Sequence, residues 1–388
     1  MDLETARPRL PALTSLRFFA AAHVVIFHFL AMGILRGPAW YQKLSSIGYV
    51  GVSFFFVLSG FILVYTYAGR PMILKEFWRA RFARIYPAYA FSLLVTGPWF
   101  FFAVLTMDIP FFAWPKAHLK LVSVLVPSLL QAWVPQAALS WNPVAWSLSV
   151  EACFYLLFPF VMLFLARRSQ LQLFLAATAS WLATMALSSS YVVLNPDHLT
   201  VVNADVLGAF WLNALKFNPL ARLPEFLLGM ACGFLFLRSR RESKLALPLV
   251  LSGIAAFAVV VYFSGVIPYV ILHTALLGPA FAAIVYGFAL RPNWGAFLEN
   301  RLLVLCGDAS YSLYLLHSMI IGMYFHDRTG QLKHQSFLGV LVFVLIAVTI
   351  SALVYRFIEE PARRKLNPKR RTQAGRMETQ PPPEAVPA

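Results

Sequence analysis

Two residues that could do chemistry, Arg17 and His28, stand in an apolar stretch over about residues 13–35. Charged and imidazole side chains are costly inside a membrane and are usually functional. A separation of eleven residues rotates a helix by about 1100°, so both side chains lie on one face, roughly 16 Å apart along the axis. Arg17 would lie near the cytoplasmic end of the span and His28 nearer the middle of the membrane. This arrangement suits an anionic cofactor that arrives from the cytoplasm and delivers a chemical group into the membrane. In the alternative interpretation, Arg17 reaches lipid phosphates and His28 is a hydrogen-bonded core histidine.

Three arginines, Arg79, Arg81 and Arg84, follow the next apolar stretch. We expect this segment to be a loop in which Arg81 and Arg84 share one face of a short helical turn. Guanidinium groups bind phosphate oxygens with two hydrogen bonds, so a nucleotide-like cofactor could dock here. The alternative is that the cluster marks membrane topology and contacts lipid.

A single carboxylate, Glu151, lies in the outer part of the apolar stretch that begins at Trp146. A carboxylate at that depth needs a partner. We expect this partner to be His28, because carboxylates commonly orient or charge an imidazole. A structural ion pair is the alternative.

Three further polar residues, Ser310, Tyr314 and His317, have spacings that place them on one helical face. They could line a substrate-binding cavity or form hydrogen bonds between helices. Glu359 and Glu360, before Pro361, are expected to cap the last helix.

These side chains must be positioned by membrane helices, because the composition leaves few other options. Of 388 residues, 60% are hydrophobic and 12% are charged, whereas a soluble domain carries about a quarter charged residues. The first apolar stretch is too long for a signal peptide and lacks a cleavage site. The three cysteines lie in apolar stretches without metal-ligand or disulfide spacing, so no metal site is expected. The sequence predicts an all-α polytopic integral membrane protein.

Hydropathy and charge together predict about ten transmembrane helices. The net charge of +16 comes mainly from short loops and the tail, which is the positive-inside pattern and places both termini in the cytoplasm. The expected partner of these basic residues is anionic lipid, and no nucleic acid is expected. The expected spans are 13–35, 48–69, 85–106, 146–166, 171–190, 223–237, 245–264, 269–290, 303–325 and 336–357.

Two segments fall outside these spans. The apolar segment 121–134 is only about 14 residues long, so we expect it to be re-entrant or interfacial. Residues 1–365 are expected to form one transmembrane domain, and residues 366–388 a basic, then Pro-rich, disordered cytoplasmic tail.

Six motifs, in order along the chain, resemble those of the membrane-bound acyltransferase 3 family of bacterial O-acyltransferases. They cover the chain from about residue 10 to 365. The motifs are Leu16-Arg17-Phe-Phe-Ala-Ala with His28, Gly51-Val-Ser-Phe-Phe-Phe-Val-Leu-Ser59-Gly60-Phe, Arg81-x-x-Arg84-Ile-Tyr-Pro87, Trp146-Ser-Leu-Ser-Val-Glu151 with Phe154-Tyr155-Leu, Ser310-Tyr-Ser-Leu-Tyr-Leu-x-His317, and Glu360-Pro361.

This resemblance implies an enzyme of the bacterial inner membrane that moves an acyl group, usually acetyl, from acyl-CoA to a carbohydrate hydroxyl. It implies essential roles for Arg17 and His28, with His28 as general base or acyl carrier, and cofactor contacts at Arg81 and Arg84, with Arg79 beside them. Acyl-CoA would be the donor substrate, with no bound cofactor, and a carbohydrate or glycolipid would be the acceptor.

The sequence departs from the family pattern at two places. The family often has an acidic residue shortly before the first-helix arginine, where Thr14 and Ser15 stand here, and often doubles the glutamate at 151, where Ala152 follows. Some relatives carry an esterase-like domain, and a single-domain enzyme is expected here.

A transporter for a lipid-linked sugar is the alternative function, since it would also place histidine, glutamate and arginine at mid-membrane. It predicts no acyl transfer and no special need for Arg81 and Arg84. A signalling or assembly subunit is a weaker third possibility, because that role does not require Arg17 and His28 to align.

Overall fold

The computed structural model describes residues 7–34, 37–204, 206–239, 243–290, 297–325 and 337–366. Within these ranges every regular element is helical, so the predicted all-α class is confirmed. The expected tail at 366–388 lies almost wholly outside the described residues. The expected cytoplasmic location of both termini stays a prediction.

Nine helical segments of the described chain are long and apolar enough to cross a membrane. A shorter apolar helix over Ala275–Leu290 occupies the place of the tenth expected span. It consists of the 3-10 turn η5 (Ala275–Leu277) and α13 (Gly278–Leu290), and the short α12 (Tyr269–His273) precedes it. The nine long segments are built from α1 (Pro11–Ala31), α3 (Gly51–Tyr67), α4 (Leu74–Thr106), α7 (Trp146–Ala166), α8 (Gln170–Leu194), α9 (Phe210–Phe217) with α10 (Pro219–Arg238), α11 (Ala246–Phe263), α14 (Arg301–Phe325), and α15 (Phe337–Val354) with α16 (Glu360–Leu366).

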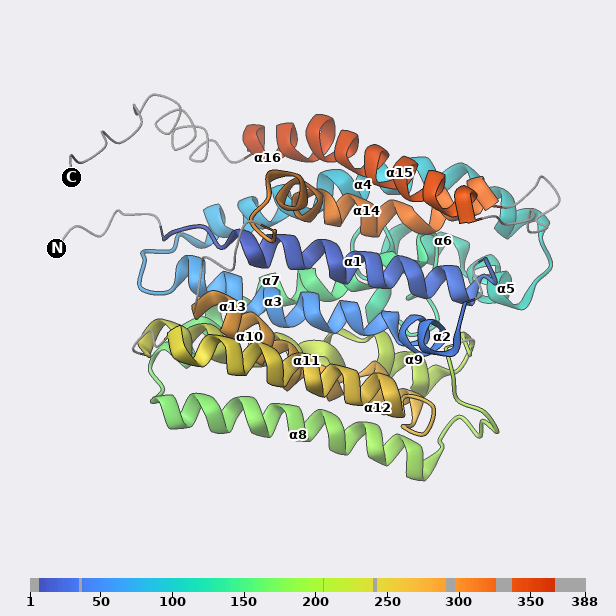
Figure 1. Ribbon diagram of the computed structural model, residues 1–388. Coiled ribbons are helices and arrows are strands. Elements are labelled where there is room, and N and C mark those ends of the chain that lie inside the picture. Colours follow the sequence, from blue (N-terminus) through green and yellow to red (C-terminus); the bar gives the residue numbers. More distant parts are fainter. Residues whose placement is uncertain are drawn as a thin grey trace.

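The long helices lie side by side along one common direction (Figure 1). In this view α8 lies along one edge of the bundle and α15 with α16 along the opposite edge, with α1 and α3 between them. α1 packs against α14, and α3 packs against α10. The first of these pairs brings the first-span motif beside the Ser310–His317 motif.

The predicted loop around Arg79, Arg81 and Arg84 is wrong, because all three belong to the 33-residue helix α4. Arginine and alanine favour helices, so nothing before Pro87 ends the helix. Pro87 lacks only one N–H donor, and a membrane helix tolerates that loss where neighbouring groups cover the freed carbonyl. The arginines therefore have fixed positions on a rigid element.

The segment 121–134 does not cross the bundle. It begins in α6 (Leu119–Leu125) and continues through turns into a 3-10 turn at Gln131–Trp133. Gln131 is fully buried and donates to the carbonyl oxygen of Ala145 at 3.1 Å, and the Tyr89 hydroxyl donates to the carbonyl of Val126 at 2.6 Å. Irregular backbone at membrane depth needs such protein cover.

Helices α3 and α10 approach closely at Gly60 and Gly229. A Cβ atom added to Gly60 would overlap the carbonyl oxygen of Phe226, and one added to Gly229 would overlap the carbonyl of Val57. Small residues at such a crossing let two membrane helices pack backbone to backbone. The contact fixes the position of Ser59, next to Gly60, on α3.

Candidate functional site

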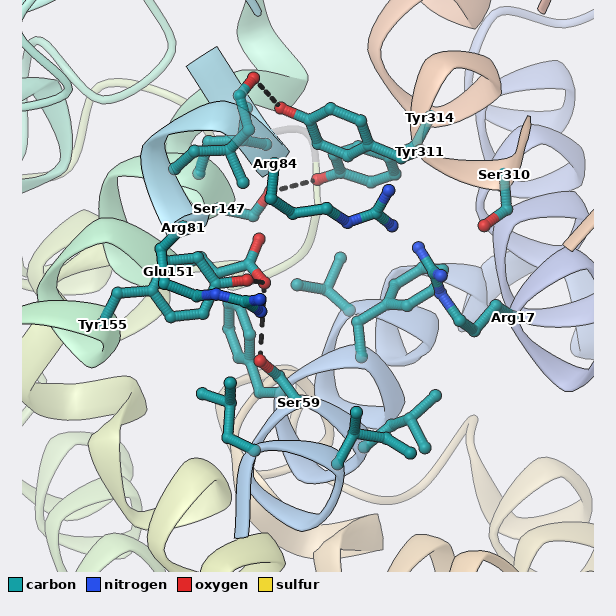
Figure 2. A pocket seen from close by; sticks show the side chains of 18 residues that line it. Arg17, Ser59, Arg81, Arg84, Ser147, Glu151, Tyr155, Ser310, Tyr311 and Tyr314 are labelled. Carbon is teal, nitrogen blue, oxygen red and sulfur yellow. Dashed lines mark hydrogen bonds between the residues drawn. The ribbon is translucent and has the colours of Figure 1, made fainter. Parts of the chain in front are cut away.

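A cavity of about 160 Å³ lies among α1, α3, α4, α7 and α14 (Figure 2). Its apolar wall is formed mainly by α3, and its polar groups come from all five helices. These polar groups are Arg17, Ser59, Arg81, Arg84, Ser147, Glu151, Tyr155, Ser310, Tyr311 and Tyr314. Six of the nine residues expected to form the site, from four distant parts of the sequence, thus meet around one space.

The cationic charge of Arg84 is balanced by the buried carboxylate of Glu359. Glu359 also accepts from Ser312 at 3.3 Å and pairs with Arg363 at 3.4 Å. A π-helical turn, Tyr355–Glu359, directs Glu359 toward α4 at this point; such turns are frequent at functional sites. Glu359 thus binds an arginine of another helix, a contact that the expected capping of the last helix did not include.

Arg81 has a different environment from Arg84. Its guanidinium lies over the rings of Tyr67, Phe77 and Tyr155, at 5.6–5.9 Å from their centroids. Its Nε is buried and has no hydrogen-bond partner. Among the residues that the structure describes, Arg81 forms no ion pair with a carboxylate.

Arg17 also reaches the cavity without forming an ion pair or hydrogen bond to any described residue. Figure 2 shows its guanidinium pointing inward, opposite Arg81 and near Arg84. Because Glu359 balances Arg84, Arg17 and Arg81 are left facing a single carboxylate in the cavity, that of Glu151. The residues that line the cavity therefore carry more positive than negative charge, which favours an anionic ligand.

The structure places Glu151 with Tyr155 and Ser59, and no hydrogen bond joins it to His28. Its Oε1 accepts from the Tyr155 hydroxyl and, at 3.4 Å, from Ser59. Tyr155 lies one helical turn after Glu151, a spacing that the sequence already contains. Its position makes Glu151 a group of the cation-lined cavity.

Tyr314 and Ser310 lie at the wall formed by α14. The Tyr314 hydroxyl donates to the carbonyl of Val144 at 2.8 Å and accepts from Ser147 at 2.8 Å. Ser310 donates to the carbonyl of Gly307 at 2.7 Å. Both side chains therefore line the cavity while they are hydrogen-bonded to neighbouring residues.

His28 and His317 lie outside the cavity wall and contact each other. The Nδ1 of His28 and the Nε2 of His317 are 3.2 Å apart, and the ring centroids are 4.7 Å apart. Tyr314 lines the cavity, and its backbone carbonyl accepts from the Nδ1 of His317. Arg79 is exposed on α4 and does not line the cavity.

A second buried polar cluster was not anticipated from the sequence. Arg222 and Glu225, each with a side chain only 1% exposed, form an ion pair on α10 at 3.0 Å. Arg222 also donates to Ser53 at 2.9 Å and to the carbonyl of His273. His273 is itself buried beside this pair. The sequence signal was the pair of opposite charges three residues apart. The expected span 223–237 included Glu225 but not Arg222, so the pair was overlooked.

These features define a polytopic helical membrane protein with a cation-lined internal cavity, and the comparisons with known proteins give its family. The sequence model of the acyltransferase 3 family, which describes an acyltransferase domain, matches residues 10–356 of this chain. The chain belongs to this family, and it is a membrane-embedded acyltransferase.

Two relatives show how far the similarity extends. Acyltransferase MdmB of Streptomyces mycarofaciens is 29% identical over 394 residues, which cover 93% of this chain and 94% of MdmB. The O-acetyltransferase OatA of Staphylococcus aureus strain NCTC 8325 is 28% identical, over 92% of this chain. The alignment covers 57% of OatA, so this chain spans little more than half of that relative's length. No solved structure is significantly similar to the chain.

Proposed function

We propose that the chain is an O-acyltransferase of a bacterial inner membrane that moves an acetyl group from acetyl-CoA to a hydroxyl of an exported or surface carbohydrate. The observation that carries this proposal is the pair of guanidinium groups, Arg17 and Arg81, that face one cavity without carboxylate partners among the described residues. Coenzyme A is rich in phosphate, and arginine suits phosphate oxygens.

Donor binding involves the arginines unequally. Arg81 holds a phosphate of the donor, and Arg17 attracts the same anion from α1. Arg84 acts differently, since its charge is engaged by Glu359, and it holds the cytoplasmic end of the last helix against α4. Arg79 is exposed and takes no part beyond attracting anions to the surface.

The transfer step uses His28. Its imidazole removes the proton from the acceptor hydroxyl while that oxygen attacks the thioester carbonyl, and the proton then goes to the departing sulfur of coenzyme A. In the alternative mechanism, His28 first accepts the acyl group as a covalent acyl-histidine, and the acceptor hydroxyl then takes the group from it. His28 lies further along α1 than Arg17 and does not line the cavity, so the acyl group must move beyond the cavity to reach it.

The acceptor class rests on the relatives. OatA is named as an O-acetyltransferase and MdmB as an acyltransferase, which favours transfer to oxygen. A sugar hydroxyl on a glycan or glycolipid is the acceptor that the family resemblance favours. Ser310 and Tyr314 would contact the substrate from α14.

The experiment uses the full chain purified into lipid nanodiscs and supplied with radiolabelled acetyl-CoA. We expect label to move to a glycolipid fraction from the source membrane, and His28→Ala to abolish this transfer. His23→Ala, on the same helix but hydrogen-bonded to the carbonyl of Leu44 at 2.8 Å, is the matched control and keeps activity. Wild-type transfer by a well-inserted His28→Ala variant would refute the proposed role.

A lipid-linked sugar transporter is distinguished by mass spectrometry of the cell-surface glycans. With the gene present, the enzyme adds one acetyl group per modified sugar. A transporter changes the amount of glycan without this mass difference.

A further inference from the structure

The pairing of two histidines from α1 and α14 has a consequence for the proposed base. We propose that His317 is a positioning residue that fixes the tautomer of His28 and leaves the Nε2 of His28 free to accept a proton. This inference rests on the proposed function of His28. In this proposal His317 orients His28, instead of lining the substrate-binding cavity as expected from the sequence.

Two backbone carbonyls indicate which ring nitrogens carry the protons. The Nδ1 of His317 is 2.7 Å from the carbonyl oxygen of Tyr314, and the Nδ1 of His28 is 2.8 Å from that of Val24. A carbonyl oxygen only accepts hydrogen bonds, so each Nδ1 must carry a proton. A neutral imidazole has a single N–H, so the Nε2 of each ring is then an acceptor.

The contact between the two rings fits this assignment. The Nδ1–H of His28 is shared between Val24 and the Nε2 of His317, which is 3.2 Å away. The opposite tautomer of His28 would place two lone pairs, on Nδ1 and on the Nε2 of His317, against each other. His317 thus disfavours the tautomer in which His28 could not act as a base through Nε2.

The acceptor side of His28 remains available. Among the described residues, none forms a hydrogen bond with its Nε2, and the residue is partly exposed. A carboxylate often holds a catalytic histidine in the required tautomer, but Glu151 is bound to Tyr155 and Ser59 instead. A fully buried neutral histidine performs the orienting task here.

The proton balance of the step is complete. The Nε2 of His28 takes the hydroxyl proton as the new C–O ester bond forms, and the ring becomes a cation. It stays hydrogen-bonded through Nδ1–H to His317 and Val24. When the C–S bond breaks, the Nε2–H proton passes to the sulfur, which regenerates neutral His28 and free coenzyme A.

The test compares His317→Leu with His317→Gln in nanodiscs, using acetyl-CoA and the same glycolipid fraction. Leucine removes the acceptor, whereas glutamine places an amide oxygen near the position of the imidazole Nε2. We expect His317→Leu to lower kcat about 10- to 100-fold with little change in KM for acetyl-CoA, as for other partners that orient a histidine, and His317→Gln to restore much of the loss. His23→Leu, the matched control on α1, should keep kcat.

A spectroscopic readout separates positioning from folding. In protein labelled with ¹⁵N-histidine, the His28 signals, assigned by their loss in His28→Gln, should report a bare Nε2 in the wild type and a mixture of tautomers in His317→Leu. Unchanged tautomer signals in His317→Leu, or equal kcat losses for leucine and glutamine, would overturn the inference. If His28→Ala is fully active, the proposed function itself fails, whereas an active His317→Leu beside an inactive His28→Ala refutes only the role of His317.

Discussion

The guanidinium of Arg84 is bound to the carboxylate of Glu359, which lies 275 residues further along the chain and is completely buried. Arg81, three residues earlier on α4, has aromatic rings around it and no carboxylate partner among the described residues. Both arginines of the motif line the cavity, but Arg84 is paired with a carboxylate of another helix, whereas Arg81 is not.

Replacing Glu359 by alanine should strongly destabilise the protein. The change leaves Arg84, with only 15% of its side chain exposed, without its anion, and removing one partner of a buried pair costs about 3–5 kcal/mol. Thermal unfolding in nanodiscs measures the loss, and the double variant Arg84→Met/Glu359→Ala should recover part of it.

The matched control is Glu360→Ala. Glu360 is the next residue, but its partners Arg356 and Arg364 are more than half exposed, and exposed pairs contribute only about 0–1 kcal/mol. Equal losses for the Glu359 and Glu360 variants would contradict the structural role of the Arg84–Glu359 pair.

Replacing Arg81 by alanine should weaken donor binding. A hydrogen bond to a charged group contributes about 1.5–3 kcal/mol, so KM for acetyl-CoA should rise roughly 10- to 100-fold. Arg79→Ala removes an exposed arginine from the same helix and should change KM less than about threefold. Initial rates at varied acetyl-CoA test both, and a similar rise for Arg79→Ala would indicate that general surface charge attracts the donor.

The ion pair between Arg222 and Glu225 should behave as a unit. Glu225→Ala leaves a fully buried guanidinium with only neutral partners, Ser53 and the ring and carbonyl of His273, and we expect a loss of about 3–5 kcal/mol in stability. The double variant Arg222→Met/Glu225→Met should be closer to wild type, since apolar replacements of a buried pair are often neutral. A double variant less stable than Glu225→Ala would contradict this expectation.

Gly60→Ala should separate α3 from α10. Its new Cβ would lie 2.8 Å from the backbone nitrogen of Met230 and would overlap the carbonyl of Phe226, and overpacking of this kind costs about 1–3 kcal/mol. Gly265→Ala is the control, because no atom lies within 4 Å of its new Cβ. Thermal unfolding of both variants checks the prediction, and an unchanged Tm for Gly60→Ala would disprove the close crossing.

Local sequence signals predicted the class of fold and several elements correctly. Apolar runs identify membrane helices because each span must satisfy its own backbone within one segment. The shorter helix at Ala275–Leu290 and the long helix through Arg79 departed from the expectation. In α4, the helix propensity of arginine and alanine continues the helix through the segment that was expected to be a loop. The contact of Glu151 with Tyr155 was accessible to sequence reasoning, since the two residues are four apart on one helix.

The sequence by itself determined that this chain is an all-α membrane protein, that Arg17 and His28 share one face of the first helix, and, through its ordered motifs, its family. Only the tertiary structure decided which partners these side chains meet. His317 contacts His28 across 289 residues of sequence, and Glu359 binds Arg84 across 275. Helical periodicity places side chains around one axis, but which two axes lie together depends on packing between distant helices, such as the close crossing at Gly60 and Gly229.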